Sequence, residues 1–150
     1  MEGRTYRYME KEPMYPFGFG LSYTNFEYSD LKINQNKIKK GESARVSIKV
    51  RNAGKIAGDE VVQLYISDIE ASVRVPKWEL KDFARITLYS GETREINFDL
   101  SPEMFAIVDE QGNEFVESGD FKILVGGCSP GARGEKLGVF PMQDGEITII

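Results

Sequence analysis

The carboxylates are the first groups in this sequence to consider for catalysis. Asp68 and Glu70 stand two positions apart, and Glu110 directly follows Asp109. Hydrolysis of a glycosidic bond uses two carboxyl groups, one on each side of the bond and roughly 5–9.5 Å apart. Residues this close together in a loop seldom face each other across a cleft. We therefore interpret both pairs as solvated surface groups, and we expect no catalytic residue in the chain.

Other kinds of chemical site are limited by the residue types available. The chain has no histidine and one cysteine, Cys128, which leaves no Ser-His-Asp triad, internal disulfide or cysteine-based zinc site. The stretch around Cys128, "LVGGCSPG", offers no base, so we interpret it as an inert thiol. Asp109, Asn113 and Glu114 supply fewer oxygen ligands than a calcium loop needs, and a hairpin turn is the favoured interpretation there. We expect neither a metal nor a cofactor.

Composition indicates one ordinary globular domain. The chain has 150 residues, of which 41% are hydrophobic and 29% charged, and its net charge is −5. This sign argues against nucleic acid or an anionic membrane as a partner, because both are bound by clustered Lys and Arg. The densest basic run, "KIKK" at 37–40, is interpreted as a solvated loop. No apolar stretch could span a bilayer and residues 1–14 do not resemble a signal peptide, so the compartment is left open.

Alternating apolar and polar residues predict a series of half-buried strands. In "SARVSIKV" (43–50) every second residue is apolar, and similar patterns occur at 26–33, 59–67, 94–100 and 120–127. Within 59–67, the set expected to face the core is Val62, Leu64 and Ile66, and the set on the opposite face is Val61, Gln63 and Tyr65. In 26–33 the pattern changes parity near Ser29 and Asp30, which predicts a β-bulge.

Turn signals separate these strands and indicate the fold class. Glycine-containing turns stand at 39–42, 52–58, 89–92, 109–113 and 117–120, and the sequence has one helical turn, "SPEMF", with Ser101 as its expected N-cap. Short strands at this spacing predict an all-β fold, an antiparallel β-sandwich of about seven strands. Without two core cysteines around a tryptophan, a fibronectin-III-like sandwich is favoured over an immunoglobulin domain. One long irregular connection is expected, at 68–83.

Three aromatic residues are candidates for sugar contact. Trp78 lies in the long connection, where it could stack on a sugar or simply anchor the loop, and anchoring is favoured because aromatic residues mostly supply buried area. Tyr65 and Tyr89 are the other candidates. A row of exposed rings would make the chain an independent carbohydrate-binding module that takes oligosaccharides, and this remains the alternative function.

The N-terminal stretch "YPFGFGLSYT" (15–24) is rich in aromatic residues and glycine. With its surroundings, "MEGRTYRYMEKEPMYPFGFGLSYTNFEYSDL", it resembles the segment that leads into the C-terminal domain of glycoside hydrolase family 3, the β-glucosidase and β-xylosidase family. Three later stretches resemble the same family in order, "NAGKIAGDEVVQLYISD", "WELKDFARITLYSGETREINFDLSPEMFAIVDEQGN" and "ESGDFKILVGGCS". The resemblance covers roughly residues 1–130.

The resemblance implies a part of a longer enzyme. It corresponds to the family's fibronectin-III-like domain, so residues 1–24 are expected to be a linker from the preceding domain and residues 25–150 the sandwich. No stretch matches the motif around the family's nucleophile. The implied function is a non-catalytic accessory domain that docks on the catalytic domains of the same polypeptide, stabilises them and shapes the active-site cleft of a β-glucosidase-like parent.

The implied docking residues are the large apolar side chains of the linker, Tyr15, Phe17, Phe19, Leu21 and Tyr23. They would wedge between the sandwich and the preceding domain, with Gly18 and Gly20 permitting close backbone approach. In the isolated chain we expect residues 6–23 either to drive self-association or to be disordered. The tail "GEITII" is expected to form one more edge strand or to return to the catalytic domain.

Overall fold

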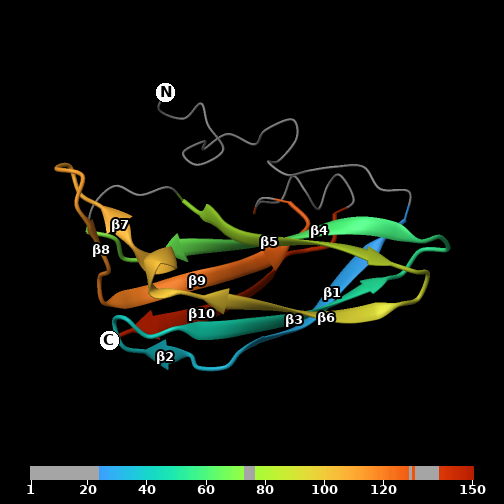
Figure 1. The fold of residues 1–150 in the computed structure, drawn as a ribbon, viewed down its shortest axis with the longest axis horizontal. Coiled ribbons are helices and arrows are strands. Elements are labelled where there is room, and N and C mark those ends of the chain that lie inside the picture. The colour runs from blue at the N-terminus through green and yellow to red at the C-terminus, as the bar shows by residue number, and fades with distance from the viewer. Residues whose placement is uncertain (1–23, 73–76, 129, 131–138) are drawn as a thin grey trace.

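A computed structural model describes residues 24–72, 77–128, 130 and 139–150, which form a sandwich of two β-sheets (Figure 1). The strands are β1 (Phe26–Ile33), β2 (Lys37–Ile38), β3 (Ala44–Asn52), β4 (Gly58–Asp68), β5 (Glu79–Leu88), β6 (Thr93–Leu100), β7 (Ile107–Val108), β8 (Glu114–Phe115), β9 (Gly119–Gly126) and β10 (Gln143–Ile149). A single 3₁₀ turn, η1 (Pro102–Phe105), follows β6. No helix in the described residues is long and apolar enough to cross a membrane.

The two sheets have the strand order of a fibronectin-III-like sandwich. One contains β1-β3-β6 and the other β2-β10-β9-β4-β5, while β7 and β8 form a small hairpin. All strand pairs are antiparallel except the short contact between β2 and β10. Seven of the described strands have seven residues or more. The predicted fold class is confirmed.

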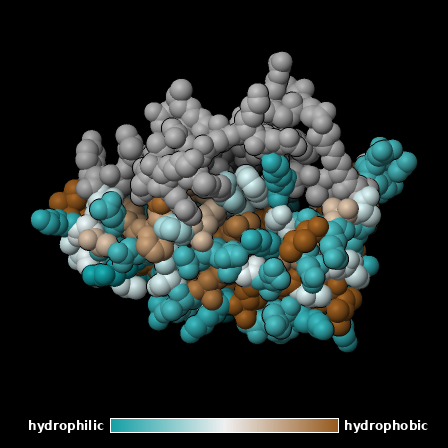
Figure 2. Space-filling view, turned by 180° about the vertical axis from the view of Figure 1, so that it is seen from behind, coloured by the Kyte–Doolittle hydropathy of each residue, from teal (hydrophilic) through white to brown (hydrophobic). Residues whose placement is uncertain are grey.

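Alternation along the strands places the core between the sheets. Inward-facing side chains of β3, β4, β6 and β9 pack together as predicted, including Val46, Val62, Phe98 and Ile123. Phe105 of η1 joins them and meets Phe121 edge-to-face at 5.1 Å between ring centroids. On the outside, Figure 2 shows that the described residues facing the viewer are mostly hydrophilic, with apolar side chains in separate small patches.

The parity change in β1 is a β-bulge, as predicted. The pairing of β1 with β3 shifts between Ser29 and Lys32. Asp30, within the bulge, has a φ of 53°, a left-handed conformation that Asp tolerates better than most residues. The bulge lets Phe26 and Tyr28 reach the core on one side of the shift while Leu31 and Ile33 pack against it on the other.

Four local predictions were wrong in part. Residues 79–83 are not irregular, because β5 begins at Glu79 and pairs with β4. The basic run at 37–40 contributes β2, in which Ile38 is buried in the core. Ser101 precedes η1, but its side chain makes no capping hydrogen bond. The tail does form a strand, β10, and it lies between β9 and β2 rather than at an open edge.

Candidate functional site

The outer face of the three-stranded sheet is a solvated surface. Its outward positions carry charged and polar side chains, and these pair across strands in ion pairs, among them Arg45–Asp99 at 2.8 Å and Lys49–Asp30 at 3.3 Å. Alternation of this kind, with apolar residues inside and charges outside, is typical of an antiparallel sheet that has water on one side. This face therefore has no feature that indicates a partner.

The outer face of the five-stranded sheet is different. In β4, five consecutive residues from Val62 to Ile66 are buried, so this strand is covered on both of its faces. Tyr65 points away from the core and belongs to no part of the core cluster, yet its exposed fraction is 0%. Gln63, on the same side, is also buried.

Apolar side chains surround Tyr65 on this face. The register places Leu80 of β5 and Leu124 of β9 on either side of it. Phe83 lies opposite Gln63 and is 62% exposed, one of the largest apolar surfaces among the described residues. We call this set the outer apolar face, defined by Val61, Gln63, Tyr65, Leu80, Phe83 and Leu124. It is the candidate functional site, because its apolar side chains lie outside the core and two of them, Val61 and Phe83, are exposed to solvent.

Hydrogen bonds fix the polar atoms of the outer apolar face. The Tyr65 hydroxyl donates to Gln63 Oε1 at 2.6 Å, and Gln63 Nε2 donates to the carbonyl of Gly127 at 3.1 Å. The chain therefore ties the end of β9 to the middle of β4. Because buried polar groups are costly unless they are paired, these bonds make burial of the two side chains feasible.

Trp78 stands at one end of β5 in a partly buried corner. Its indole N–H is buried and makes no hydrogen bond, and the same holds for Oδ2 of Asp68. Burial, with a smaller effect from the carboxylates of Glu117 and Glu70, raises the pKa of Asp68. The paired-carboxylate interpretation of Asp68 and Glu70 as fully solvated groups is therefore wrong for Asp68, which is partly shielded from water.

Glu117 and Glu70 do not form a catalytic pair with Asp68. Glu70 donates its backbone N–H to Asp68 Oδ1 at 3.0 Å, and Glu117 accepts hydrogen bonds from the backbone and hydroxyl of Ser72, which lower its pKa. The carboxylates of Asp68 and Glu117 thus each accept a hydrogen bond in a local loop contact. Among the described residues, no group of three potential ligands is arranged to hold a metal ion.

The second carboxylate pair, at Asp109, belongs to a hairpin turn as expected. Asp109 Oδ1 accepts hydrogen bonds from the backbone of Gln111 and Asn113, which lower its pKa. Gly112 in the same turn has a φ of 84°, which suits glycine. Between β7 and β8, this turn uses Asp109 as a structural acceptor.

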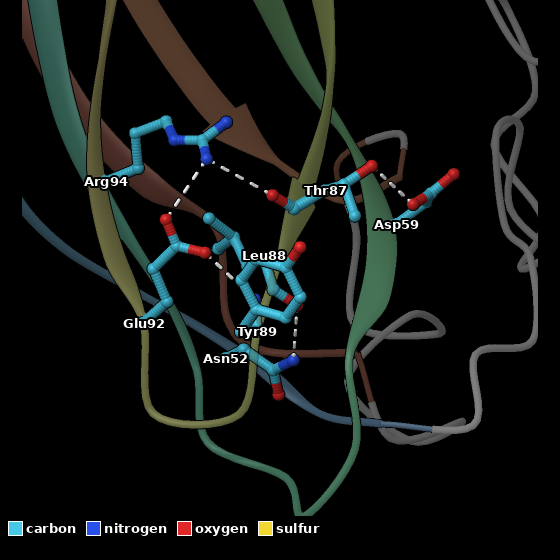
Figure 3. Close-up of polar contacts among 7 residues, drawn as sticks. All are labelled: Asn52, Asp59, Thr87, Leu88, Tyr89, Glu92 and Arg94. Carbon is cyan, nitrogen blue, oxygen red and sulfur yellow. Dashed lines mark hydrogen bonds and ion pairs between the residues drawn. The ribbon is translucent and has the colours of Figure 1, made fainter.

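Tyr89 stands at the opposite end of β5 from Trp78, in the turn to β6 (Figure 3). Its ring is 72% exposed, and its backbone N–H donates to Glu92 Oε1 at 2.9 Å. Arg94 bridges the turn by bonding to Glu92 and to the carbonyl of Thr87, both visible in Figure 3. The turn is therefore well tied while the ring itself points into solvent.

The three sugar-contact candidates do not form one platform. Trp78 and Tyr89 flank β5 and are eleven positions apart, about 36 Å along an extended strand. The prediction for Tyr65 is wrong, because its ring is buried and cannot stack on a sugar. A ring that faces outward in the alternation pattern looked accessible, and the strand's own sequence carries no sign of what lies over it.

A buried polar cluster at the entrance to β4 was not predicted. The Tyr28 hydroxyl donates to Glu60 Oε2 at 2.9 Å. Desolvation raises the pKa of Glu60, and also raises that of Tyr28. Cys128 lies nearby, where burial and then the charge of Glu60 raise the pKa of its thiol to about 11. The sequence did carry a signal for the burial of Glu60, because alternation along β4 places it on the same side of the strand as Val62 and Leu64.

Comparison with known proteins agrees with this architecture. Residues 60–129 match the family model of the fibronectin type III-like domain. This chain contains a fibronectin type III-like domain. It is 45% identical over 128 residues to thermostable β-glucosidase B of Acetivibrio thermocellus, with 83% of this chain and 17% of that protein aligned.

Solved structures with the same domain include two β-glucosidases. That of Erythrobacter marinus is 37% identical with a TM-score of 0.82, covering 98% of this chain and 18% of that one. A family 3 β-glucosidase of Bifidobacterium adolescentis is 32% identical with a TM-score of 0.78, covering 95% of this chain and 20% of that one. The resemblance to glycoside hydrolase family 3 is confirmed. This chain spans about a fifth or less of the length of these relatives.

The predicted docking residues of the fibronectin type III-like domain lie outside the described part of the chain. Tyr15, Phe17, Phe19, Leu21 and Tyr23 all fall within 1–23, and so does all but the last residue of the predicted linker. Their role stays a prediction. What the structure does describe is the place where this segment joins the domain, at Thr24.

Proposed function

We propose that the fibronectin type III-like domain is a non-catalytic accessory domain of a family 3 glycoside hydrolase. In this proposal it docks on the catalytic domains of its own polypeptide, stabilises them and shapes the cleft of a β-glucosidase-like enzyme. The observation that carries the proposal is the outer apolar face, which an independent soluble sandwich has no reason to build. The similarity to β-glucosidases over about a fifth or less of their length supports it.

The carboxylates described above support a role without catalysis. Each described carboxylate that has a shifted pKa and a loop position is used as an acceptor for nearby backbone or hydroxyl groups. Glycoside hydrolysis needs two carboxyl groups that face each other across a substrate. Hydrolysis in the parent would then be carried out by other domains, and this domain would act through its surface.

The test of the docking role uses the longer polypeptide in which this sequence occurs. Replacing Phe17 and Phe19 with serine removes two large apolar groups from the proposed contact, and we expect the whole enzyme to unfold several degrees lower and to lose activity on an aryl β-glucoside. Asn97→Ala, on the solvated outer face, is the matched control and is expected to change neither. Wild-type unfolding and activity in the double serine variant would contradict the docking role.

Carbohydrate binding by the domain alone is the weaker alternative. Of its three candidate rings, only Tyr89 is well exposed, and it stands alone at its end of the sheet. An NMR titration of this chain with oligosaccharides of β-glucan, xylan and arabinan tests the alternative directly. We expect no saturable shift at Tyr89 or Trp78 up to millimolar ligand, and a saturable shift there would instead establish a binding module.

A further inference from the structure

Asn52, the last residue of β3, has a buried side chain whose polar atoms are all paired. Its Oδ1 accepts hydrogen bonds from the Thr24 hydroxyl at 2.6 Å and from the Gly54 backbone N–H at 3.0 Å. Its Nδ2 donates to the carbonyl of Ile56 at 2.8 Å and to that of Leu88 at 3.0 Å, the latter drawn in Figure 3. An asparagine side chain accepts two hydrogen bonds and donates two, so all four positions are filled. A buried polar group that is fully paired is held in one orientation.

The partners of Asn52 come from different parts of the fold. Thr24 precedes β1, two partners lie in the connection from β3 to β4, and Leu88 is the last residue of β5. Asn52 belongs to the three-stranded sheet and Leu88 to the five-stranded sheet, so this side chain joins the two sheets. The backbone of Asn52 adds the turn from β5 to β6, since its N–H donates to the carbonyl of Glu92 at 2.9 Å and its carbonyl accepts from the N–H of Gly91 at 2.8 Å.

The chain enters the sandwich at Thr24, and this entry is fixed by its backbone as well as by its side chain. Thr24 is buried, and the next residue, Asn25, accepts a hydrogen bond from the N–H of Ala53 at 2.8 Å. The backbone of Gly54 lies directly against the Thr24 side chain, because a methyl group added there would overlap it. The end of β3 and the connection that follows it therefore hold the entry from two sides.

The same contacts relate the entry to the outer apolar face. Leu80 and Phe83 of that face belong to β5, and Leu88 ends the same strand. Because Asn52 binds both Thr24 and Leu88, the position of the entry is set relative to β5. A surface held in its binding geometry before it meets a partner loses less conformational freedom when it binds.

We propose that Asn52 is a positioning residue that makes the entry of the chain at Thr24 a rigid joint and not a hinge. The joint would hold the outer apolar face in a fixed direction relative to the incoming chain and so pre-organise it for docking. The pre-organisation rests on the proposed function, whereas the rigid joint is a property of this chain alone. Asn52 itself would touch no docking partner and would act through Thr24 and Leu88.

Backbone ¹⁵N relaxation of the 150-residue chain tests the rigid joint. We expect the order parameter at position 24 to be about 0.85, the value of rigid backbone, and to fall below about 0.6 in Thr24→Val, which keeps the shape of the side chain and removes its hydroxyl. Thr24→Ser keeps the hydroxyl and should restore the higher value. Thr93→Val, at an exposed position of β6, is the matched control and should leave position 24 unchanged. A uniform loss of stability would not lower the order parameter of one position in the folded state.

Hydrogen exchange of side-chain amides tests the hold on Asn52 directly. We expect the Nδ2 protons of Asn52 to exchange at least about a hundredfold more slowly than those of Asn97, which is exposed on the solvated outer face. Equal exchange at the two side chains would overturn the proposal. So would a low order parameter at position 24 in the wild-type chain, or one that Thr24→Val leaves unchanged.

The pre-organisation is tested by comparing Thr24→Val in two settings. In the longer polypeptide, the substitution should lower the unfolding temperature by more than it does in the 150-residue chain, because docking is weakened in addition to the local loss. Equal shifts in the two settings would overturn the pre-organisation. The relaxation and exchange measurements involve no catalytic domain, so failure of the docking role in the variant with serine at positions 17 and 19 would leave the rigid joint standing.

Discussion

Truncation of Tyr65 to alanine provides a direct measure of whether the outer apolar face is covered. The ring is fully excluded from solvent although it lies outside the core cluster. Its hydroxyl also donates to Gln63. We therefore expect this side chain, on the outside of a sheet, to behave energetically like a core residue.

The expected magnitude follows from the burial. A fully buried aromatic ring costs about 3–5 kcal/mol when it is cut back to alanine, since both transfer free energy and a cavity contribute. Phe83 lies on the same face but is only about a third buried, so Phe83→Ala should cost about 1 kcal/mol. For a chain of this size, the Tyr65→Ala loss lowers the unfolding temperature by roughly 6–20 °C.

Urea unfolding of the two variants at 25 °C, followed by far-ultraviolet circular dichroism, measures both losses of unfolding free energy. Tyr65→Phe is a third variant that keeps the ring and removes the hydrogen bond, and we expect it to cost about 0.5–1.5 kcal/mol. A Tyr65→Ala loss no greater than that of Phe83→Ala would refute the reasoning, because an uncovered ring has little burial to lose.

Three further predictions concern other parts of the fold. The raised pKa of Glu60 means that the folded chain holds this proton more tightly than the unfolded chain, so the free energy of unfolding should fall as pH rises from about 4.5. Urea unfolding at several pH values measures this fall. Glu60→Gln should remove it, and the exposed control Glu110→Gln should not. At pH 8 about one Cys128 thiol in a thousand is ionised, against roughly one in four for a free cysteine, so Ellman's reagent should react at least a hundredfold more slowly in the folded than in the unfolded chain. In Gly54→Ala the added methyl group would overlap the Thr24 side chain, and we expect a loss of about 1–3 kcal/mol in thermal or urea unfolding; an unchanged midpoint would show that Thr24 moves freely.

The sequence was sufficient to predict the features that follow from the alternation of apolar and polar residues. In β3 and β6 every second residue is apolar, and the strands, their inward faces and the sandwich follow from this pattern alone. The β1 bulge was predicted for the same reason, because a change of parity between Tyr28 and Leu31 has only one simple geometric solution.

The sequence did not predict features that depend on contacts with residues from other strands. In β5, Lys81 is an extra residue where the pairing with β4 shifts between Leu64 and Tyr65, so the alternation is broken and the strand looked irregular. Tyr65 sits at an outward position of a well-formed strand, and nothing in the alternation of β4 indicates that its ring is buried. The raised pKa of Glu60 likewise arises from burial beside Tyr28, a residue 32 positions away.

The place of β10 between β9 and β2 affects how the domain folds. Thr148 of β10 pairs with Lys37 of β2, so residues more than a hundred positions apart must meet before the five-stranded sheet is complete. Pairing of such distant segments slows folding, and sandwiches of this kind typically fold in milliseconds to seconds. During synthesis, β9 would expose an unpaired edge until residues 143–149 emerge from the ribosome, and unpaired edges invite aggregation. We therefore expect the pairing of β10 to be a late step of folding.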